Sequence, residues 1–450
     1  MTDYSAEAAR VFELLLNRIG ESAPQPRLHA TQRVLELLGD PQNMYKIVHI
    51  TGTNGKTSTA RMIESLIRSY GLRPGLMTSP HLVKVNERIV IDGEPISDEA
   101  FVYNWNDIER YVLMADAELV ANGEEPLTYF EALTVLAFAS FADAPVDVAI
   151  LEVGMGGEWD STNVADGDVA VFAPISLDHM ERLGNTIEEI AKTKSGIIKS
   201  GAFVVSSAQP AEALAVLKDK ASSTADSFKS YGADFEVLES TPDILGQKVS
   251  IRTLAGEYSD LNLPVHGYYQ AENAALAIAA VEAFLGGGEQ RIMDDVVRAA
   301  FADFSSPGRL QVVSREPLVI LDAAHNPGGA ESLVQSLKTS FGSPYVIAII
   351  SILADKDARG LLEALDSSVV EVIITQSSSP RATPAEKLAE LAREIFGADR
   401  VKVQANPQWA LAEATLALPE GQKSAILVTG SITLVGEVLA LKQIEAEQDV

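Results

Sequence analysis

The sequence predicts an α/β protein of two domains, each built from stacked βαβ units. Short apolar runs that are typical of buried parallel strands alternate with helix-like runs along the chain. A turn that contains two glycines and a lysine joins one of these strands to the helix that follows. The alternation restarts after a cluster of turn-forming residues at 305–309. We therefore predict one domain over residues 1–305 and a second over residues 306–450.

The individual elements follow from the same patterns. In the first domain, strands are expected at residues 45–51, 146–153, 168–173 and 202–206, and helices at about 58–70, 187–194 and 269–285. The last helix is expected to stop at glycines 286–288, because glycine favours the C-terminal end of a helix. In the second domain, strands are expected at residues 318–321, 345–351, 369–375, 401–403 and 425–429, with helices between them.

Composition excludes several classes of protein. Hydrophobic residues make up 47% of the chain and charged residues 22%, which suits large buried cores. No apolar run reaches the roughly 20 residues of a membrane helix, and the N-terminus lacks the cationic start of a secretory signal. Cysteine is absent, which removes disulfides and thiolate nucleophiles and suits a reducing cytoplasm. The net charge of −28 disfavours nucleic acid and anionic membranes as partners.

The segment ITGTNGKTST has the composition of a phosphate-binding loop between a strand and a helix. Gly52 and Gly55 allow backbone N–H groups to turn toward a phosphate, and Lys56 adds a cation. The hydroxyl of Thr57 is placed to reach Mg²⁺. The loop is a shorter variant of the usual pattern, since Ile50 stands where the first glycine is expected. The alternative is a tight strand-to-helix turn with a surface lysine.

Four polar residues outside this loop are candidates for metal or phosphate chemistry. Glu152 lies at the C-terminal end of an apolar strand, where ligand sites form in parallel sheets. A buried carboxylate there needs either a metal such as Mg²⁺ or an Arg or Lys partner. His179 follows the next predicted strand, Lys194 lies in a predicted helix, and Ser79 follows another apolar run. Taken singly, these three read as a structural histidine, a solvated lysine and a helix N-cap.

Together these motifs resemble the Mur ligase superfamily, and within it the folylpolyglutamate synthase/dihydrofolate synthase family. The resemblance covers nearly the whole chain, in the order GTNGKT at 52–57, TSPHL at 78–82, LTYFE at 127–131, LEVGMGG at 151–157, SLDH at 176–179, TKSGIIK at 193–199, GYYQAENAALA at 267–277, SPGRLQ at 306–311, LDAAHNP at 321–327, LADKD at 353–357 and VTGS at 428–431. It implies a P-loop-containing, mostly parallel-sheet ATPase domain followed by a smaller Rossmann-like α/β domain.

The resemblance implies an ATP-dependent ligase. Its acceptor carboxylate, on dihydropteroate or a reduced folate, would attack ATP to give an acyl phosphate and ADP. The amino group of L-glutamate would then displace phosphate and form an amide. The family implies ATP, two Mg²⁺ ions and a lysine carbamate derived from CO₂. We expect a cytoplasmic monomer that acts on small molecules.

The resemblance also assigns residues to roles, which fall into four groups. The nucleotide would be held by Gly52, Thr53, Asn54, Gly55, Lys56, Thr57 and Ser58 together with Asn273, Arg309 and Asp322. The metal ligands would be Thr57, Ser79, Glu152, His179 and Lys194, the last as a carbamate, because an ammonium group repels Mg²⁺. The expected catalytic residues are Lys56, His179, Lys194 and His325. The acceptor pocket would be lined by His81, Thr128, Tyr129, Phe130, Trp159 and Asp160.

Three alternatives differ in class or acceptor. A peptidoglycan-type Mur ligase is disfavoured, because 51 residues precede Gly52 and the first of them read as helical, which leaves no room for a nucleotide-sugar domain. A cyanophycin-type or other amino-acid ligase with a different acceptor stays open. Glu158 and Trp159 stand where many relatives carry a basic residue and a leucine, a difference that bears on the acceptor pocket and not on the ATP chemistry. A P-loop switch protein is the third alternative, although the chain has no Asn-Lys-x-Asp guanine-reading motif.

Overall fold

The computed structural model describes residues 3–21 and 23–448. Its contacts divide the chain into two compact units. The first contains Met1–Leu238, Ile251–Ser259 and Glu272–Phe301, and the second contains Glu239–Ser250, Asp260–Ala271 and Ala302–Val450. The division therefore crosses the chain at several places, and the single boundary predicted at residues 305 and 306 stays a prediction.

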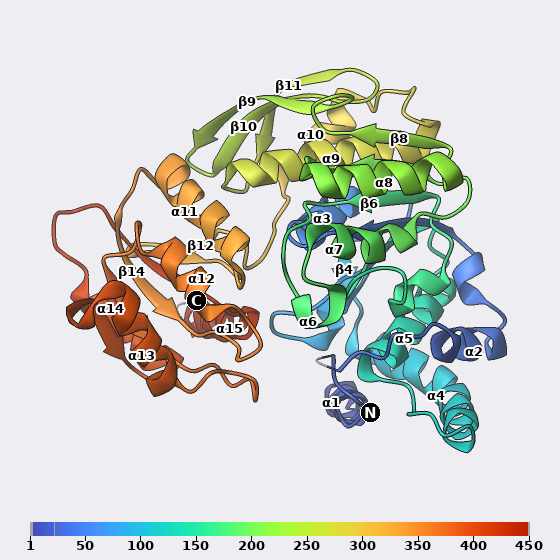
Figure 1. Ribbon diagram of the computed structural model, residues 1–450, viewed down its shortest axis with the longest axis horizontal. Helices are drawn as coiled ribbons and strands as arrows, with labels where there is room; N and C mark the ends of the chain where they lie inside the picture. Colours follow the sequence, from blue (N-terminus) through green and yellow to red (C-terminus); the bar gives the residue numbers. More distant parts are fainter. Residues whose placement is uncertain (1–2, 22, 449–450) are drawn as a thin grey trace. The chain divides into compact units, whose positions relative to one another are not determined.

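An eight-stranded sheet forms the centre of the first unit (Figure 1). Its order is β4 (Glu94–Pro95), β3 (Ile89–Ile91), β2 (Pro74–Met77), β5 (Val148–Glu152), β1 (Lys46–Thr51), β6 (Val169–Phe172), β7 (Phe203–Ser206) and β8 (Ser227–Ser230). The strands from β2 to β8 in this order run parallel, whereas β3 and β4 pair antiparallel at one edge. β1 lies between β5 and β6, so the loop after β1 starts at the middle of the sheet.

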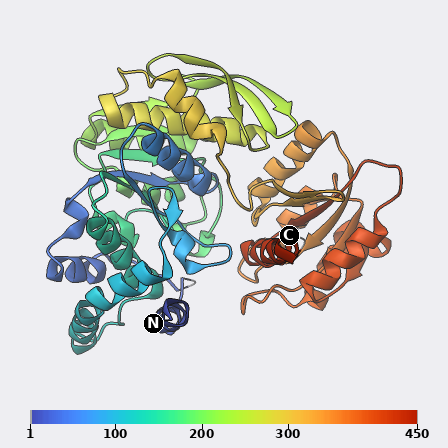
Figure 2. The same cartoon turned by 180° about the vertical axis from the view of Figure 1, so that it is seen from behind.

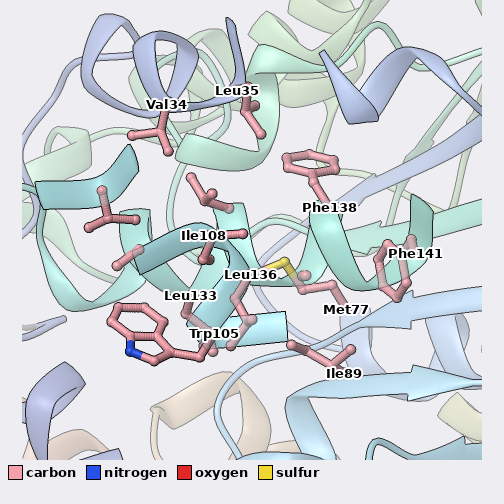
Figure 3. Close-up of a cluster of buried hydrophobic side chains, with 14 of the residues drawn as sticks. Val34, Leu35, Met77, Ile89, Trp105, Ile108, Leu133, Leu136, Phe138 and Phe141 are labelled. Carbon is pink, nitrogen blue, oxygen red and sulfur yellow. The ribbon is translucent and has the colours of Figure 1, made fainter. Parts of the chain in front are cut away.

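One face of this sheet is covered by α1 (Tyr4–Leu16), α2 (His29–Leu37), α4 (Asp98–Ala121) and α5 (Tyr129–Asp143), which share a hydrophobic core with it. Figure 3 shows part of that core, with Trp105, Phe138 and Met77 among its side chains. A second core joins β6 and β7 to α7 (Ile187–Lys194) and α8 (Ala211–Thr224). Burial of apolar surface at these two cores fixes the ends of the strands from which the loops emerge.

The remaining elements before residue 303 are shorter or lie outside these cores. They are α3 (Lys56–Ser69), α6 (Met180–Leu183), α9 (Tyr268–Gly286) and α10 (Asp294–Ala302), with the 3₁₀ helices η1 (Pro41–Asn43), η2 (Val85–Arg88), η3 (Ser161–Val164) and η4 (Ser195–Ile197). A three-stranded sheet has the order β11 (Glu257–Leu263), β10 (Gly246–Arg252) and β9 (Glu236–Asp243).

The second unit contains a six-stranded sheet (Figure 2). Its order is β12 (Gln311–Arg315), β13 (Leu318–Leu321), β17 (Ser424–Thr429), β14 (Tyr345–Ile350), β15 (Glu371–Ile374) and β16 (Val401–Val403). Only β12 is antiparallel to its neighbour. Its helices are α11 (Pro327–Phe341), α12 (Ala358–Leu365), α13 (Ala385–Phe396), α14 (Pro407–Ala417) and α15 (Ile432–Gln448), with η5 (Ala398–Arg400). The first three of these helices share a core with the sheet.

The predicted fold class is confirmed, because both large sheets are mostly parallel and alternate with helices. Each strand expected from an apolar run is present within a residue or two of its predicted bounds. The sheet of β9, β10 and β11 was not predicted. Every residue of β9 is half-buried or exposed, and the strand carries no apolar run that a sequence pattern would reveal.

A small residue is needed at Gly75, where β2 passes under α5. A Cβ atom at this position would lie 2.5 Å from Cδ1 of Phe141, a fully buried ring. We therefore expect Gly75→Ala to lower the free energy of unfolding by about 1–3 kcal/mol through overpacking. Urea denaturation would measure this change, with Gly20→Ala as control because no atom lies within 4 Å of a Cβ there. Equal losses in the two variants would contradict the packing account.

Candidate active site

The phosphate loop connects β1 to α3 and depends on two glycines. Gly52 has φ 152° and Gly55 has φ 85°, both unfavourable for residues with a side chain. A Cβ at Gly52 would lie 2.7 Å from the Cβ of Ala173, in the loop after β6. A Cβ at Gly55 would lie 2.7 Å from Oδ1 of Asn273, on α9. The loop is thus held closely between its neighbours, and Asn273 lies beside it. The contact of Asn273 with a nucleotide stays a prediction.

Two lysines donate to one carbonyl oxygen of this loop. The Nζ atom of Lys56 is 3.1 Å from the oxygen of Gly52 and 3.2 Å from that of Thr53. The Nζ atom of Lys194 is 2.7 Å from the same Gly52 oxygen. The Lys194 side chain is buried, and this burial, followed by the charge of Lys56, lowers the pKa of Lys194 to about 7. A substantial fraction of Lys194 is therefore a neutral amine at neutral pH.

Lys194, at the end of α7, lies close to the loop that follows β5. The glycines of that loop permit this close approach. A Cβ at Gly157 would lie 2.8 Å from the carbonyl oxygen of Lys194. The backbone N–H of Glu158 donates to the oxygen of Thr193 over 2.8 Å. The hydroxyl of Thr51, at the end of β1, donates to the oxygen of Gly156 over 2.8 Å. These contacts tie β1, the loop after β5 and α7 together at one end of the sheet.

Glu152 meets two other predicted metal ligands. It is the last residue of β5, is 1% exposed, and its carboxylate oxygens are 2.8 and 3.0 Å from the hydroxyl oxygen of Thr57. The backbone N–H of Ser79 donates to Oε2 of Glu152 over 3.3 Å. The structure thus brings Glu152, Thr57 and Ser79 together. No cluster of three or more His, Asp or Glu side chains suited to a metal occurs in the described part of the chain.

His179 belongs to a segment that is bonded to the phosphate loop. The hydroxyl of Thr53 donates to the oxygen of Ser176 over 3.0 Å, and its N–H donates to the oxygen of Pro174 over 2.8 Å. His179 is the N-cap residue that precedes α6, with φ 51°, and its Nε2 lies 3.9 Å from Oδ2 of Asp178. The role of His179 as a metal ligand stays a prediction.

The residues predicted for the acceptor pocket divide into two groups. Tyr129 is buried, with the guanidinium carbon of Arg88 5.3 Å from its ring centre, while Thr128 caps α5. A Cβ at Gly154 would lie 2.7 Å from Cζ of Phe130, so Phe130 packs on the loop after β5. His81 accepts a hydrogen bond from Arg88 and lies near the ring of Phe12.

Trp159 and Asp160 form the second group, within the loop after β5. Trp159 is half-buried against the core of α7 and α8. The Asp160 carboxylate accepts hydrogen bonds from the N–H of Met155 at 2.9 Å, and from the N–H and hydroxyl of Thr162 at 3.0 and 2.6 Å. Asp160 therefore organises its own loop, and its contact with an acceptor stays a prediction.

The second unit gathers Arg309, Asp322 and His325. Asp322 follows β13, and its carboxylate accepts hydrogen bonds from the N–H groups of Leu310 at 2.8 Å and Ala324 at 2.9 Å. Burial raises the pKa of Asp322, although the charge of Arg309 opposes this shift. Nδ1 of His325 is 3.0 Å from the oxygen of Ala323. Their predicted contacts with ATP or glutamate stay predictions.

Sequence reasoning missed two charged residues near the acceptor group, Arg88 and Glu21. The guanidinium of Arg88 is paired with the Glu21 carboxylate. The available signal was an arginine directly before the apolar run IVI, a position where a charge needs a partner. Their separation of 67 residues along the chain gave no sign that the two meet.

The fold and the site define a Mur ligase. Residues 50–281 match the profile of the Mur ligase middle domain, and residues 308–432 match that of the Mur ligase glutamate ligase domain. A Mycobacterium tuberculosis protein named dihydrofolate synthase/folylpolyglutamate synthase is 41% identical over 460 residues, which cover 98% of this chain and 94% of that protein. The Escherichia coli protein of the same name is 35% identical over 343 residues, which cover 76% and 75%. The chain belongs to the dihydrofolate synthase/folylpolyglutamate synthase family, as the motifs predicted.

Solved structures support the same assignment. Mycobacterium tuberculosis folylpolyglutamate synthase, complexed with ADP and AMPPCP, superposes with a TM-score of 0.93 at 41% identity and covers 98% of this chain and 99% of that one. Escherichia coli FolC in complex with DHPP and ADP gives a TM-score of 0.84 at 29% identity, with 100% of both chains covered. None of the helices in the described residues is long and apolar enough to cross a membrane.

The buried amine of Lys194 predicts a pH dependence of stability. Its pKa is about 7 in the folded protein against 10.5 for the ordinary group, so between these values the unfolded chain binds more protons. The folded state therefore gains stability as pH rises through this range. Denaturant unfolding in CO₂-free buffer should show this gain in the unmodified protein and a smaller gain in Lys194→Met. Parallel curves for the two proteins would contradict a depressed pKa.

Proposed function

We propose that this chain is an ATP-dependent ligase that adds L-glutamate to dihydropteroate and to reduced folates through an acyl phosphate. The observation that carries the proposal is the meeting of Lys56, Lys194, Thr57 and Glu152 at a phosphate loop. Family membership supplies the reaction, because its relatives are named dihydrofolate synthase/folylpolyglutamate synthase. The ligase assignment follows directly from the family, whereas the use of both acceptors is our proposal.

The phosphates of ATP would bind at the N-terminus of α3, where N–H groups and the helix dipole favour anions. Lys56 now donates to two carbonyl oxygens of its own loop, and these bonds are exchangeable for bonds to phosphate oxygens. The fixed turn at Gly52 and Gly55 keeps the backbone close to the ligand. Asn273, Arg309 and Asp322 are proposed as further nucleotide contacts.

A divalent metal fits the donors at Glu152. Mg²⁺ typically binds proteins through one or two carboxylates together with substrate phosphates, and Glu152, Thr57 and Ser79 supply such a sparse set of oxygen atoms. Bound Mg²⁺ would neutralise charge on the transferring phosphoryl group. A Yersinia pestis relative has been solved with AMPPNP and a Mn ion. Within this chain, Glu152 and Thr57 are already aligned by their hydrogen bonds.

Lys194 would carry a carbamate and, with His179, hold the second Mg²⁺. A neutral amine adds CO₂ and releases one proton, and the lowered pKa of Lys194 supplies that neutral form near pH 7. The modification would replace a buried cation beside Lys56 by an anionic oxygen donor. His179 lies in the segment bonded to Thr53 at the same loop. The assignment of a carbamate to Lys194 is supported by the burial of its side chain and by the charge of Lys56 beside it.

In the proposed reaction, residues of the chain stabilise charge, bind the acceptor and face the phosphates or the incoming glutamate. Lys56 stabilises negative charge as the acceptor carboxylate attacks the γ-phosphorus and ADP leaves. Tyr129, Phe130 and Trp159 offer flat rings to the pterin–aminobenzoate arm, each stacked pair contributing about 0.5–1.5 kcal/mol. His325 is proposed to face the phosphates or the incoming glutamate, whose amine then displaces phosphate. A cytoplasmic setting and a monomeric state stay predictions.

An acceptor panel tests this function. We expect glutamate-dependent ADP release with dihydropteroate and with tetrahydrofolate in the presence of Mg²⁺, and none with UDP-sugar peptides. Lys56→Ala serves as the inactive control, since a loop substitution of this kind leaves folding intact. Product with tetrahydrofolate alone would remove the dihydropteroate activity from the proposal. Product with UDP-sugar peptides, or with neither folate acceptor, would leave a Mur-type ligase with a different substrate.

A further inference from the structure

A second buried cation lies near the acceptor residues and has no role in the chemistry described above. Within residues 3–21 and 23–448, Arg88 and Lys194 are the two buried side chains that come from lysine or arginine, with exposures of 3% and 4%. Lys194 donates a hydrogen bond to the phosphate loop. A guanidinium removed from water is costly unless it is paired and hydrogen-bonded, so Arg88 needs its own explanation.

The contacts of Arg88 resemble those of a carboxylate-binding arginine. Both Nη atoms donate to the two oxygens of Glu21, one on each, in the forked geometry that matches a carboxylate. Its Nε donates to Nδ1 of His81 over 2.7 Å. The guanidinium lies 5.3 Å from the ring centre of Tyr129. The position is thus a preformed carboxylate site that a residue of the chain itself fills.

Glu21 is an unusual partner for so buried a cation. Its side chain is 37% exposed, whereas that of Arg88 is buried. Glu21 lies in the segment between α1 and α2, outside any helix or strand. Moving a half-exposed carboxylate away from the guanidinium costs less free energy than moving a buried one, because the half-exposed group is already partly solvated.

One buried polar atom in the same cluster lacks a partner. The hydroxyl of Tyr129 is buried, and among the described residues it has no hydrogen-bond partner. Buried hydroxyl groups nearly always have one, so an orphan here indicates a ligand atom or water. Tyr129 touches the guanidinium of Arg88, so the orphan hydroxyl and the carboxylate site belong to one cluster.

The cluster is connected to the predicted metal ligands. The backbone N–H of Thr78 donates to the oxygen of Arg88 over 3.0 Å, and the next residue, Ser79, donates to Glu152. Burial disfavours the charge of Arg88, yet Glu21 and, more weakly, Glu152 raise its pKa. Arg88 therefore lies within electrostatic reach of the carboxylate where phosphoryl transfer is proposed.

We propose that Arg88 binds the non-reacting carboxylate of a glutamyl acceptor, and that Glu21 occupies this site until the acceptor displaces it. The inference rests on the proposed function, and it concerns the folate substrates in particular. A folate ends in a glutamate with two carboxylates, of which one reacts and the other remains an anion. That second anion must approach the phosphates inside a protein of net charge −28, so it needs a local cation. The two Nη atoms of Arg88 would bind this carboxylate, and the Tyr129 hydroxyl is available to donate a hydrogen bond to it.

Two acceptors separate this role from a structural one. Tetrahydrofolate carries both carboxylates, whereas its conjugate with γ-aminobutyrate in place of glutamate keeps the reacting γ-carboxylate and lacks the α-carboxylate. Arg88→Lys keeps a charge but loses the fork. We expect this variant to raise KM for tetrahydrofolate about tenfold, the effect of one charge-assisted hydrogen bond. KM for the γ-aminobutyrate conjugate should change by less than about threefold, because no carboxylate is lost there.

Glu21→Gln provides the independent variant, because Glu21 is half-exposed and its replacement has nearly the same size. If Glu21 competes with the acceptor, this variant should lower KM for tetrahydrofolate and leave KM for the conjugate unchanged. If Glu21 is only a structural tether, KM should rise equally for both acceptors. Because the two explanations predict opposite changes in KM for Glu21→Gln, the inference can be tested even if Arg88→Lys does not fold.

Arg10→Lys is the matched control, since Arg10 is an exposed arginine of α1 that pairs with Glu7 at 2.9 Å. It should behave as the unmodified protein with both acceptors. The inference would be overturned if Arg88→Lys and Glu21→Gln each changed KM by the same factor for tetrahydrofolate and for the γ-aminobutyrate conjugate. The ligase assignment would stay intact. Inactivity of the unmodified protein with every folate acceptor would instead overturn the proposed function, and this inference with it.

Discussion

The carbonyl oxygen of Gly52 is the point on which the site depends, because two lysines from distant parts of the chain donate to it. Lys56 arrives from the start of α3 and Lys194 from the end of α7. Burial is the larger cost for the charged form of Lys194, and repulsion by the Lys56 ammonium group adds to it. The pKa of Lys194 therefore falls to about 7, and this neutral amine at the phosphate loop is the group that we propose reacts with CO₂.

The rest of the first unit serves to hold this arrangement. β1 lies between β5 and β6, so the loops after all three strands emerge at one end of the sheet. Glycines allow these loops to approach within contact distance, at Gly52 against Ala173 and at Gly157 against Lys194. The surplus of acids elsewhere, a net charge of −28, makes the buried cations more valuable for binding anionic substrates.

The sequence was sufficient for the nine strands expected from short apolar runs and for the glycine-bearing turn at Gly52. It did not predict β8, a parallel strand whose sequence SFKS is not an apolar run. It did not reveal β9, whose residues are all exposed or half-buried. The resemblance placed Asp160 in the acceptor pocket, which stays a prediction, and it did not reveal that the carboxylate accepts hydrogen bonds from Met155 and Thr162. That arrangement depends on loop geometry that no periodicity encodes. The pairing of Arg88 with Glu21 was equally invisible, because tertiary contacts between distant loops leave no local pattern.

The most direct test of this account is the state of the Lys194 nitrogen in the intact protein. Carbon-13 NMR in buffered [¹³C]bicarbonate would be recorded for the unmodified protein and for Lys194→Met, both at neutral pH with Mg²⁺ and an ATP analogue. The account predicts a protein-bound carbamate resonance in the unmodified protein that is absent from the variant. The same resonance in both proteins, or in neither, would contradict the claim that the Gly52 contact prepares Lys194 for reaction with CO₂.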